Sequence, residues 1–427
     1  MYEYHSGVLQ WIEEKEEIGI IFGVNPYEPY LTCLRATYRQ AKGHEVFMAA
    51  CPASGTGFQP VMTGKMPVPP GLPAGQAAIK IYFRDNTLKL NKNKILPAGK
   101  LPIKILERFL KQYAAFDESV VVGPGIGLDA AVIKPQGGYL IAKTDPITFV
   151  SEDIGLYAIN INANDIAAMG GVPKWFLATI LLPEGRATIN MAEGIFAQLS
   201  DACKKLDISF CGGHTEITSG ILRPIVIGQM LGEAGGKGII TAAGARTGDN
   251  IIITKGIAIE AVSIMAREME KELAVRFGQR FVSRCKNFIK YPGIGVLKDS
   301  MIAVRYGRVN AMHDPTEGGI AAGLNELAIA SKAGIIIDRD KIPVFPECKR
   351  LCDYFGINPL GAIASGSLLI SAPPEDSKRI ITNLKKNGIK AVIIGRVVDK
   401  KYGVNIRENN RLKPMKVFER DEITRIF

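Results

Sequence analysis

The chain has 427 residues, of which 47% are hydrophobic and 22% charged, and this composition excludes a disordered or collagen-like polypeptide. The net charge is +11, but the basic residues are scattered, so nucleic-acid binding is not expected. No apolar run approaches the roughly 20 residues of a membrane span. The seven cysteines form no C-x-x-C pair and the N-terminal segment does not resemble a signal peptide, so we expect a cytoplasmic protein.

Residues 1–96 differ from the rest of the chain in their sequence pattern. The stretch CPASGTGFQPVMTGKMPVPPGLPAG is rich in proline and glycine and lacks a helical or strand period. We therefore predict an irregular or poorly ordered N-terminal appendage over residues 1–96. Regular patterns begin at Pro97, and a short amphipathic helix is expected from Ile103 to Tyr113.

A glycine-rich loop, GPGIGLD, precedes two short apolar runs that flank a Pro-Gln-Gly-Gly turn. Its spacing matches neither the dinucleotide fingerprint nor the P-loop, and the flanking runs predict a β-hairpin. If residues 135–138 form the turn, Lys134 faces Tyr139 and Asp129 faces Thr144. Asp129 then lies beside Asp145, and a shared Mg²⁺ would make this arrangement favourable. Alternatively, both acids simply end their strands in solvent.

A helix is expected over residues 152–169, with Ser151 as its N-cap and Gly170-Gly171 at its end. Asn164 and Asp165 lie near its C-terminal end, where the helix dipole disfavours an anion. Broken local rules often mark a functional site. Asp165 is therefore a candidate third metal carboxylate and Asn164 a candidate phosphate or metal partner; the alternative is a polar face turned to solvent.

The remaining pattern mixes strands and helices without strict alternation, which favours an α+β class with two domains. We expect a nucleotide- and metal-binding domain over residues 97–245, a second domain over 246–405 and a charged tail over 406–427. Strands are expected at 175–183, 207–213, 223–231, 309–314, 334–338, 365–372 and 390–398, and helices at 190–206, 316–331 and 374–388.

Two further glycine motifs follow strands. FCGGHTEITSG places donors and a carboxylate, His214 to Glu216, directly after Gly213. In HDPTEGG, Thr316 is expected to cap a helix whose first turn leaves backbone N–H groups open to a phosphate. An ordinary turn and an ordinary capped helix remain the alternatives. His313 and His214 are candidate metal ligands or hydrogen-bonding partners.

The motifs GPGIGLDAAVI, TDPIT, NDIAAMGGVP, GGHTEIT, HDPTEGGIAAGLNELA and PLGAIASGSLLISA, in this order, resemble the AIR synthase (PurM-like) superfamily, and HypE-like hydrogenase maturation proteins in particular. The resemblance implies a two-domain α+β subunit, a homodimer joined through the N-terminal domains, and bound ATP and Mg²⁺. It implies a metal site at Asp129, Asp145 and Asp165. The expected catalytic residues are His313, Asp314 and Glu216, and the expected nucleotide-binding residues are Gly125, Gly127, Thr144, Asn164, Gly213, Thr215, Thr316, Glu317 and Gly318.

The chain also departs from the HypE pattern. It has no cysteine after Cys352, Glu216 stands where HypE has a lysine, and Ser365 stands where HypE has a glutamate. We therefore expect an ATP- and Mg²⁺-dependent enzyme that activates an unidentified small substrate by phosphoryl transfer, without carbamoyl dehydration on a C-terminal thiol. The alternatives are a non-catalytic nucleotide-binding partner in an assembly that includes a maturation factor, and a small-molecule kinase of the thiamine-monophosphate kinase type.

Overall fold

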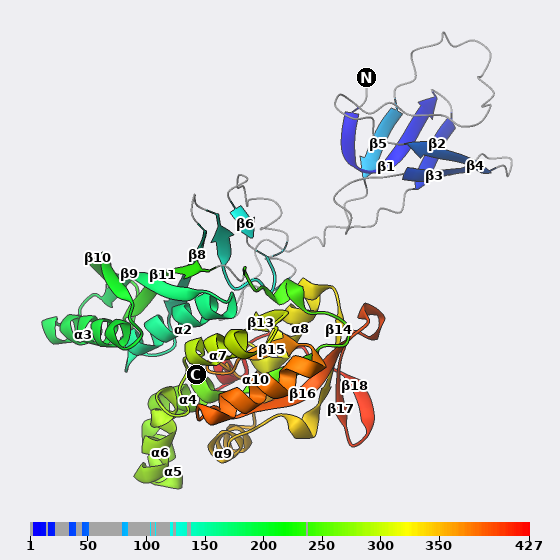
Figure 1. The fold of residues 1–427 in the computed structure, drawn as a ribbon. Helices are drawn as coiled ribbons and strands as arrows, with labels where there is room; N and C mark the ends of the chain where they lie inside the picture. Colours follow the sequence, from blue (N-terminus) through cyan, green and yellow to red (C-terminus); the bar gives the residue numbers. More distant parts are fainter. Residues whose placement is uncertain are drawn as a thin grey trace. The chain divides into compact units, whose positions relative to one another are not determined.

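The computed structural model describes residues 120–122, 125–134, 138–235 and 238–427, the helical residues Ile103 and Glu107, and the backbone of five strands between Glu3 and Phe83. The chain divides into two units, Met1–Ile95 and Leu96–Phe427 (Figure 1). Among the described residues, no helix combines the length and apolarity needed to cross a membrane.

The first unit contains an antiparallel sheet in the order β4-β3-β2-β1-β5. Its strands are β1 (Glu3–Glu13), β2 (Glu16–Ile21), β3 (Leu34–Arg39), β4 (Glu45–Ala50) and β5 (Ile79–Phe83). The sequence predicted an irregular appendage here because the proline- and glycine-rich stretch dominated its pattern. That stretch lies outside the described residues, as does the helix expected from Ile103 to Tyr113 apart from Ile103 and Glu107.

The N-terminal half of the second unit is a six-stranded sheet in the order β10-β9-β11-β8-β7-β6, and helices α2 and α3 pack against it (Figure 1). The strands are β6 (Val120–Val122), β7 (Ala131–Ile133), β8 (Tyr139–Ile147), β9 (Val172–Pro183), β10 (Ser209–Thr218) and β11 (Ile225–Ala234). The helices are α2 (Ile154–Ala168) and α3 (Ile189–Lys205).

The β7–β8 hairpin has the predicted register. Ala131 pairs with Ala142, and Ile133 pairs with Leu140. Extended by the same register, this pairing places Asp129 opposite Thr144, next to Asp145. The prediction of this register used the turn position alone, and the structure confirms it. The turn of a hairpin fixes the register of its two strands.

Helix α2 begins later than predicted. Its N-cap is Asp153, which adopts a left-handed conformation, and not Ser151, and the first turn holds no acidic residue. The Asp153 side chain makes no cap and forms an ion pair with Arg267, 2.5 Å away. The helix ends as predicted, with Gly170 at a φ of 73° just beyond its C-cap.

The C-terminal half is a seven-stranded sheet in the order β13-β15-β12-β16-β14-β17-β18. Its strands are β12 (Asn250–Thr254), β13 (Ala311–His313), β14 (Gly334–Asp338), β15 (Leu369–Ala372), β16 (Ala391–Val398), β17 (Val404–Glu408) and β18 (Arg411–Pro414). Its helices are α4 (Ile259–Glu268), α5 (Glu270–Phe277), α6 (Gln279–Lys286), α7 (Leu297–Tyr306), α8 (Gly319–Ser331), α9 (Pro346–Phe355) and α10 (Pro374–Lys386). The mixture of helices and sheets confirms the α+β class.

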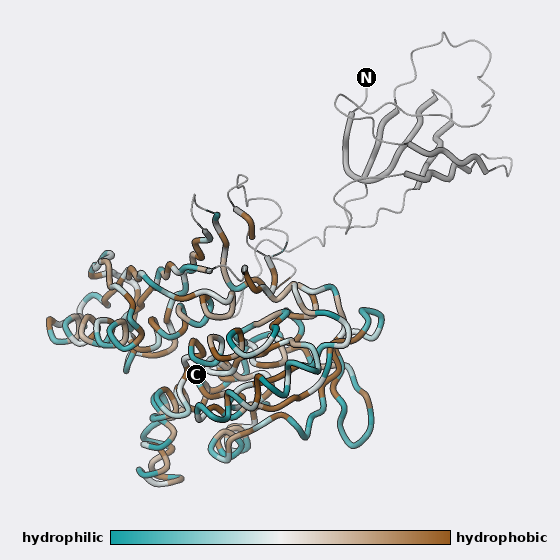
Figure 2. The backbone as a smooth tube through the Cα atoms, viewed as in Figure 1, coloured by the Kyte–Doolittle hydropathy of each residue, from teal (hydrophilic) through white to brown (hydrophobic). Residues whose placement is uncertain are grey.

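Strand β12 shows how this sheet is covered on both faces. Ile251 and Ile253 belong to the hydrophobic cluster that includes helix α8, whereas Ile252 belongs to the cluster that includes helices α7 and α10. Alternate side chains of a strand point to opposite faces, so the sheet lies between these two helical layers. Accordingly, brown hydrophobic segments gather on the inner strands in Figure 2.

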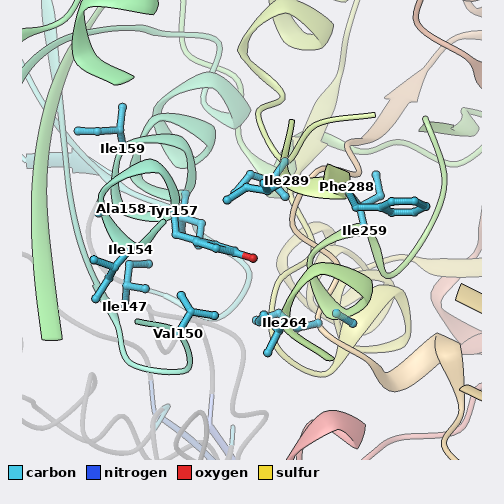
Figure 3. Packing of buried hydrophobic residues seen from close by; sticks show 14 of the residues in the cluster. Ile147, Val150, Ile154, Tyr157, Ala158, Ile159, Ile259, Ile264, Phe288 and Ile289 are labelled. Carbon is cyan, nitrogen blue, oxygen red and sulfur yellow. The ribbon is translucent and has the colours of Figure 1, made fainter. Parts of the chain in front are cut away.

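The two halves of the second unit share one hydrophobic cluster. Tyr157 and Ile154 of helix α2 pack in the same cluster as Ile264 of helix α4 and Ile289 (Figure 3). The Tyr157 hydroxyl is buried and has no hydrogen-bond partner of regular geometry among the described residues. The two halves are therefore joined by a continuous core.

The segment predicted to be a charged tail, residues 406–427, is built into the fold. Strand β17 pairs in parallel with β14 and antiparallel with β18, which extends the sheet. Beyond the hairpin, Asp421 and Ile423 are buried. The sequence did not indicate this hairpin, because it has many charged residues. Strand β14 is the strand of the sheet with which the hairpin pairs.

Candidate functional site

Strand β8 and helix α2 bring a lysine between two aspartates. Lys143 and Asp145 are two residues apart on β8, so their side chains project from the same face. The Lys143 Nζ atom lies 3.6 Å from Asp145 Oδ2 and 3.2 Å from Asp165 Oδ2 of helix α2. Lys143 is largely enclosed, and Asp165 is buried. Burial would lower the pKa of Lys143, but the attraction of Asp165 and Asp145 raises it above its ordinary value, so the ammonium stays charged.

Asp129, from the glycine loop before β7, meets His313 at the end of β13. His313 Nδ1 lies 2.7 Å from Asp129 Oδ1, in ion-pair contact without regular hydrogen-bond geometry, and Nε2 lies 2.8 Å from Glu326 Oε2 of helix α8. Burial would lower the pKa of His313, but the Asp129 and Glu326 carboxylates raise it well above its ordinary value. The imidazolium therefore links two halves of the fold, with both ring nitrogens engaged.

Asp314 follows His313 and is buried, and neither of its carboxylate oxygens has a hydrogen-bond partner among the described residues. The Asp129 Oδ2 atom is also buried and receives no hydrogen bond from the described part of the chain. One ligand atom each from Asp129, His313 and Asp314 lies within 4.8 Å of the others. Unpaired buried oxygens are costly, so these two carboxylates form a place where a cation would be stabilised.

The pKa shifts in this aspartate cluster (Asp129, Asp145, Asp165 and Asp314) also favour a bound cation. Burial raises the pKa of Asp165 to about 8; Lys143 opposes this rise, and the neighbouring aspartates add to it. Burial and the charges of Asp165 and Asp129 raise the pKa of Asp314 well above its ordinary value. Carboxylates that raise each other's pKa in this way are those that a hard divalent cation can share. The donor set, aspartate oxygens alone, fits Mg²⁺.

The glycine loop is held against helix α8. Gly127 has a φ of +70°, and a Cβ atom built on it would lie 2.5 Å from the Glu326 carbonyl oxygen. Gly125 accepts a 3.2 Å hydrogen bond from the Leu128 N–H, which forms the turn. The loop glycines thus position Asp129 beside His313 through close backbone packing.

We expect Gly127→Ala to lower the free energy of unfolding by more than about 2 kcal/mol, because it combines left-handed strain with a backbone clash. The matched control is Gly185→Ala, since Gly185 has a φ of +73° with nothing within 4 Å of its Cβ position. That variant should lose only the strain, about 1 kcal/mol. Equal losses in chemical denaturation of the two variants would contradict the clash.

Two residues expected to bind the nucleotide have other partners. Both polar groups of the Asn164 side chain are engaged, the amide donating to Ile294 O at 2.8 Å and the carbonyl oxygen accepting from Val296 N at 2.8 Å. Asn164 therefore fixes the 294–296 loop against helix α2. The Thr144 hydroxyl donates to Gly228 O at 2.8 Å, although its side chain is exposed beside Asp145.

The HDPTEGG motif begins helix α8 differently from the prediction. The helix starts at Gly319 with Gly318 as its N-cap, and Thr316 makes no side-chain cap. The Gly318 N–H, expected to be open to a phosphate, donates to Asp421 Oδ2 at 2.7 Å. Glu317 is half-buried nearby. The C-terminal segment thus supplies the anion at this helix terminus, a role that its sequence did not indicate.

We expect Asp421→Ala to lower the free energy of unfolding by about 1–2 kcal/mol, as loss of a helix N-cap does. The reason is that the N–H groups of Gly318 and Ile423 both lose their acceptor. Asp399, which accepts from Lys401 N at an exposed turn, is the matched control, and its alanine variant should change little. Equal effects in thermal denaturation would contradict a capping role for Asp421.

Within one chain, the GGHTE motif lies apart from the aspartate cluster. One row of the sheet runs through Asp145, Gly228, Ala178 and Gly213. Three strand spacings separate its ends, about 14 Å. Thr215 and Glu216 are exposed on the edge strand β10, where Glu216 accepts from the Thr218 hydroxyl at 2.8 Å. The contacts of Thr218 and His214 lower the pKa of Glu216.

Sequence reasoning missed Lys143, Glu326 and Asp421. It predicted a catalytic role for Asp314, which the structure places beside Asp129 and His313. Lys143 could have been found, because a residue two positions before Asp145 on a strand shares its face. Glu326 lies on a regular helix and Asp421 far along the chain, and no local pattern connects them with His313 or Gly318.

Family models for AIR synthase related proteins match the chain over residues 127–234, for the N-terminal domain, and 246–407, for the C-terminal domain. The chain therefore belongs to the AIR synthase related family. It is 29% identical over 315 residues to a putative hydrogenase expression/formation protein of Methanocaldococcus jannaschii, covering 71% of this chain and 90% of that one. It is also 29% identical to the carbamoyl dehydratase HypE of Rhizobium leguminosarum bv. viciae, covering 66% and 80%.

Solved structures share the fold. The structure of a HypE–HypF complex matches 74% of this chain and 99% of the matched chain, with a TM-score of 0.61 and 20% identity. A structure of the hydrogenase maturation protein HypE in complex with ATP matches 75% and 92%, with a TM-score of 0.54 and 20% identity. The chain thus has the PurM-like architecture of HypE-like proteins.

Proposed function

We propose that the protein is an ATP- and Mg²⁺-dependent enzyme that activates a small substrate by phosphoryl transfer. The carrying observation is the convergence of Asp129, Asp145, Asp165 and Asp314, with buried oxygens of Asp129 and Asp314 that receive no hydrogen bond from any described residue. Membership of the AIR synthase related family and the ATP complex of a HypE neighbour support the proposal.

In this proposal the aspartate cluster is the metal-binding region. Asp129 and Asp314 offer it buried oxygens without hydrogen bonds from the described residues, whereas Asp145 and Asp165, which the sequence also suggested as metal carboxylates, contact Lys143. A bound Mg²⁺ supplies charge stabilisation to the transferring phosphoryl group. His313 keeps Asp129 in place through its Nδ1 contact and is itself fixed by Glu326. His313 thus acts as a positioning residue, because neither ring nitrogen is free to take a proton from a substrate.

The direct test is calorimetric titration of the full chain with the non-hydrolysable analogue AMPPCP, with Mg²⁺ and with EDTA. We expect binding that requires Mg²⁺. Nucleotide binding of equal affinity in EDTA, or no binding in either condition, would contradict the proposal. Release of ADP or phosphate from ATP in the presence of candidate substrates then tests turnover.

A second function, nucleotide binding without catalysis in an assembly, has one observation in its favour. Glu216, one of the expected catalytic residues, lies on an exposed edge strand away from the aspartate cluster. Solved HypE also occurs in a complex with HypF, which makes a maturation-factor partner a reasonable candidate. Mg²⁺-dependent AMPPCP binding with no ADP or phosphate from ATP, across all substrates, would favour this second function.

We further propose that the protein forms a homodimer through its N-terminal domain. Strand β10 lies at a sheet edge, and Ile217 on it is 66% exposed. Exposed edge strands are ready templates for pairing with another chain. Light scattering after size exclusion should give twice the chain mass of 46.3 kDa, and Ile217→Lys should yield monomer. A monomeric wild-type protein would contradict the dimer.

A further inference from the structure

Within the aspartate cluster, Lys143 occupies a position that a metal ion could otherwise take. Its Nζ atom lies between Asp145 Oδ2, at 3.6 Å, and Asp165 Oδ2, at 3.2 Å, and it is the cation that joins the strand to the helix. An ammonium has three donors and no lone pair, so it attracts carboxylates but cannot be a ligand to a metal. Asp145 and Asp165 are therefore already neutralised in part by a residue of the chain.

The other two aspartates are in the opposite condition. Within the described part of the chain, neither oxygen of Asp314 has a hydrogen-bond partner, and Asp129 Oδ2 has none either. The only positive group in contact with Asp129 among the described residues is His313, which Glu326 also binds. Ligand atoms of Asp129 and Asp314 lie within 4.8 Å of each other, a separation that one cation can bridge.

We propose that Lys143 is a built-in substitute for a second metal ion, so that the cluster binds one divalent cation, between Asp129 and Asp314. This inference rests on the proposed function, because it concerns the same cluster, but it makes a separate claim about stoichiometry. In two-metal sites the ions lie about 3.5–4 Å apart, and each requires its own oxygen ligands. Here the second set of oxygens is held by the Lys143 ammonium.

A fixed ammonium also changes what the site selects. The positive charge of Lys143 repels a second divalent ion. At a few ångströms in a poorly solvated site, this repulsion is much stronger than it would be in water. The ammonium also leaves one positive charge in the cluster at every metal concentration. Lys143 is thus a specificity-determining and positioning residue, in contact with Asp145 and Asp165 and not with a reacting atom in this structure.

The test counts bound Mn²⁺, used alone as the probe, by electron paramagnetic resonance on the full-length protein. We expect one Mn²⁺ per chain for wild type and two for Lys143→Met, because Asp145 and Asp165 are then released to bind a cation. Lys143→Arg, which keeps the charge, should bind one. Lys134→Met, at an exposed position of the same hairpin, is the control for loss of a lysine and should also bind one.

Any other count for wild type or Lys143→Met overturns the inference. If Lys143→Met does not fold, as judged by circular dichroism, Lys143→Gln replaces it with the same expected count. Titration with AMPPCP and Mg²⁺ separates this failure from failure of the proposed function. If wild type binds nucleotide but takes up two Mn²⁺, only the inference about Lys143 is overturned. If wild type binds neither nucleotide nor Mn²⁺, the proposed function is overturned as well.

Discussion

Asp314→Asn should abolish Mg²⁺-dependent nucleotide binding without weakening the fold. The carboxylate makes no hydrogen bond to any residue that the structure describes, so its replacement by an amide of the same shape breaks none of the described hydrogen bonds. Burial and neighbouring aspartates raise the pKa of Asp314, so the metal-free protein gains little from its charge. A cation held by Asp129 and Asp314 would, however, lose one of its two ligands.

We expect the affinity for AMPPCP with Mg²⁺ to fall at least about 100-fold, the upper end of the cost of disturbing a partner of a metal ligand. The free energy of unfolding without metal should not fall. Asp201→Asn, at an exposed position of helix α3, is the matched control and should leave both quantities unchanged. An Asp314→Asn protein with wild-type nucleotide affinity would remove Asp314 from the site.

His313→Ala should be among the most destabilising single substitutions in this part of the chain. It removes the cation between Asp129 and Glu326, and loss of one partner from a buried ion pair costs about 3–5 kcal/mol. His214→Ala is the matched control, because His214 makes a similar 3.3 Å contact with Glu216 but is 65% exposed. Water and salt screen such an exposed pair, so its loss should change the stability little. Urea denaturation of both variants measures the difference.

The same contact has a pH dependence. The folded-state pKa of His313 lies above the unfolded value of about 6.5, so its stabilisation is complete below that pH and is lost as the pH rises through the folded pKa. Wild type should therefore lose stability at alkaline pH by an amount that His313→Ala does not lose. Parallel pH profiles for the two proteins would show that His313 is not charged in the native state.

The parts of the site that the sequence predicted are those fixed by local rules. The turn position set the β7–β8 register and so placed Asp129 near Asp145. Weak helix formers near the end of helix α2 indicated Asp165. By contrast, the contacts of His313 with Glu326 and of Gly318 with Asp421 join elements that no local period connects. Tertiary packing decides such contacts, and one sequence contains no direct signal for them.

Predictions of helix starts failed for a related reason. Ser151 and Thr316 are good N-cap residues, but helix α2 begins after Asp153 and helix α8 after Gly318. In each case a charged residue from a distant segment, Arg267 or Asp421, binds at the observed helix start. Capping propensities of about 1 kcal/mol are easily outweighed by such contacts.

The packing of Tyr157 beside Ile264 and Ile289 has a practical consequence for anyone who divides this protein. A fragment that stops near residue 245 would present the apolar side of helix α2 to water, and the complementary fragment would do the same with helix α4. We expect each fragment to aggregate when it is produced alone. When both fragments are produced in one cell, they should associate and be found in the soluble fraction.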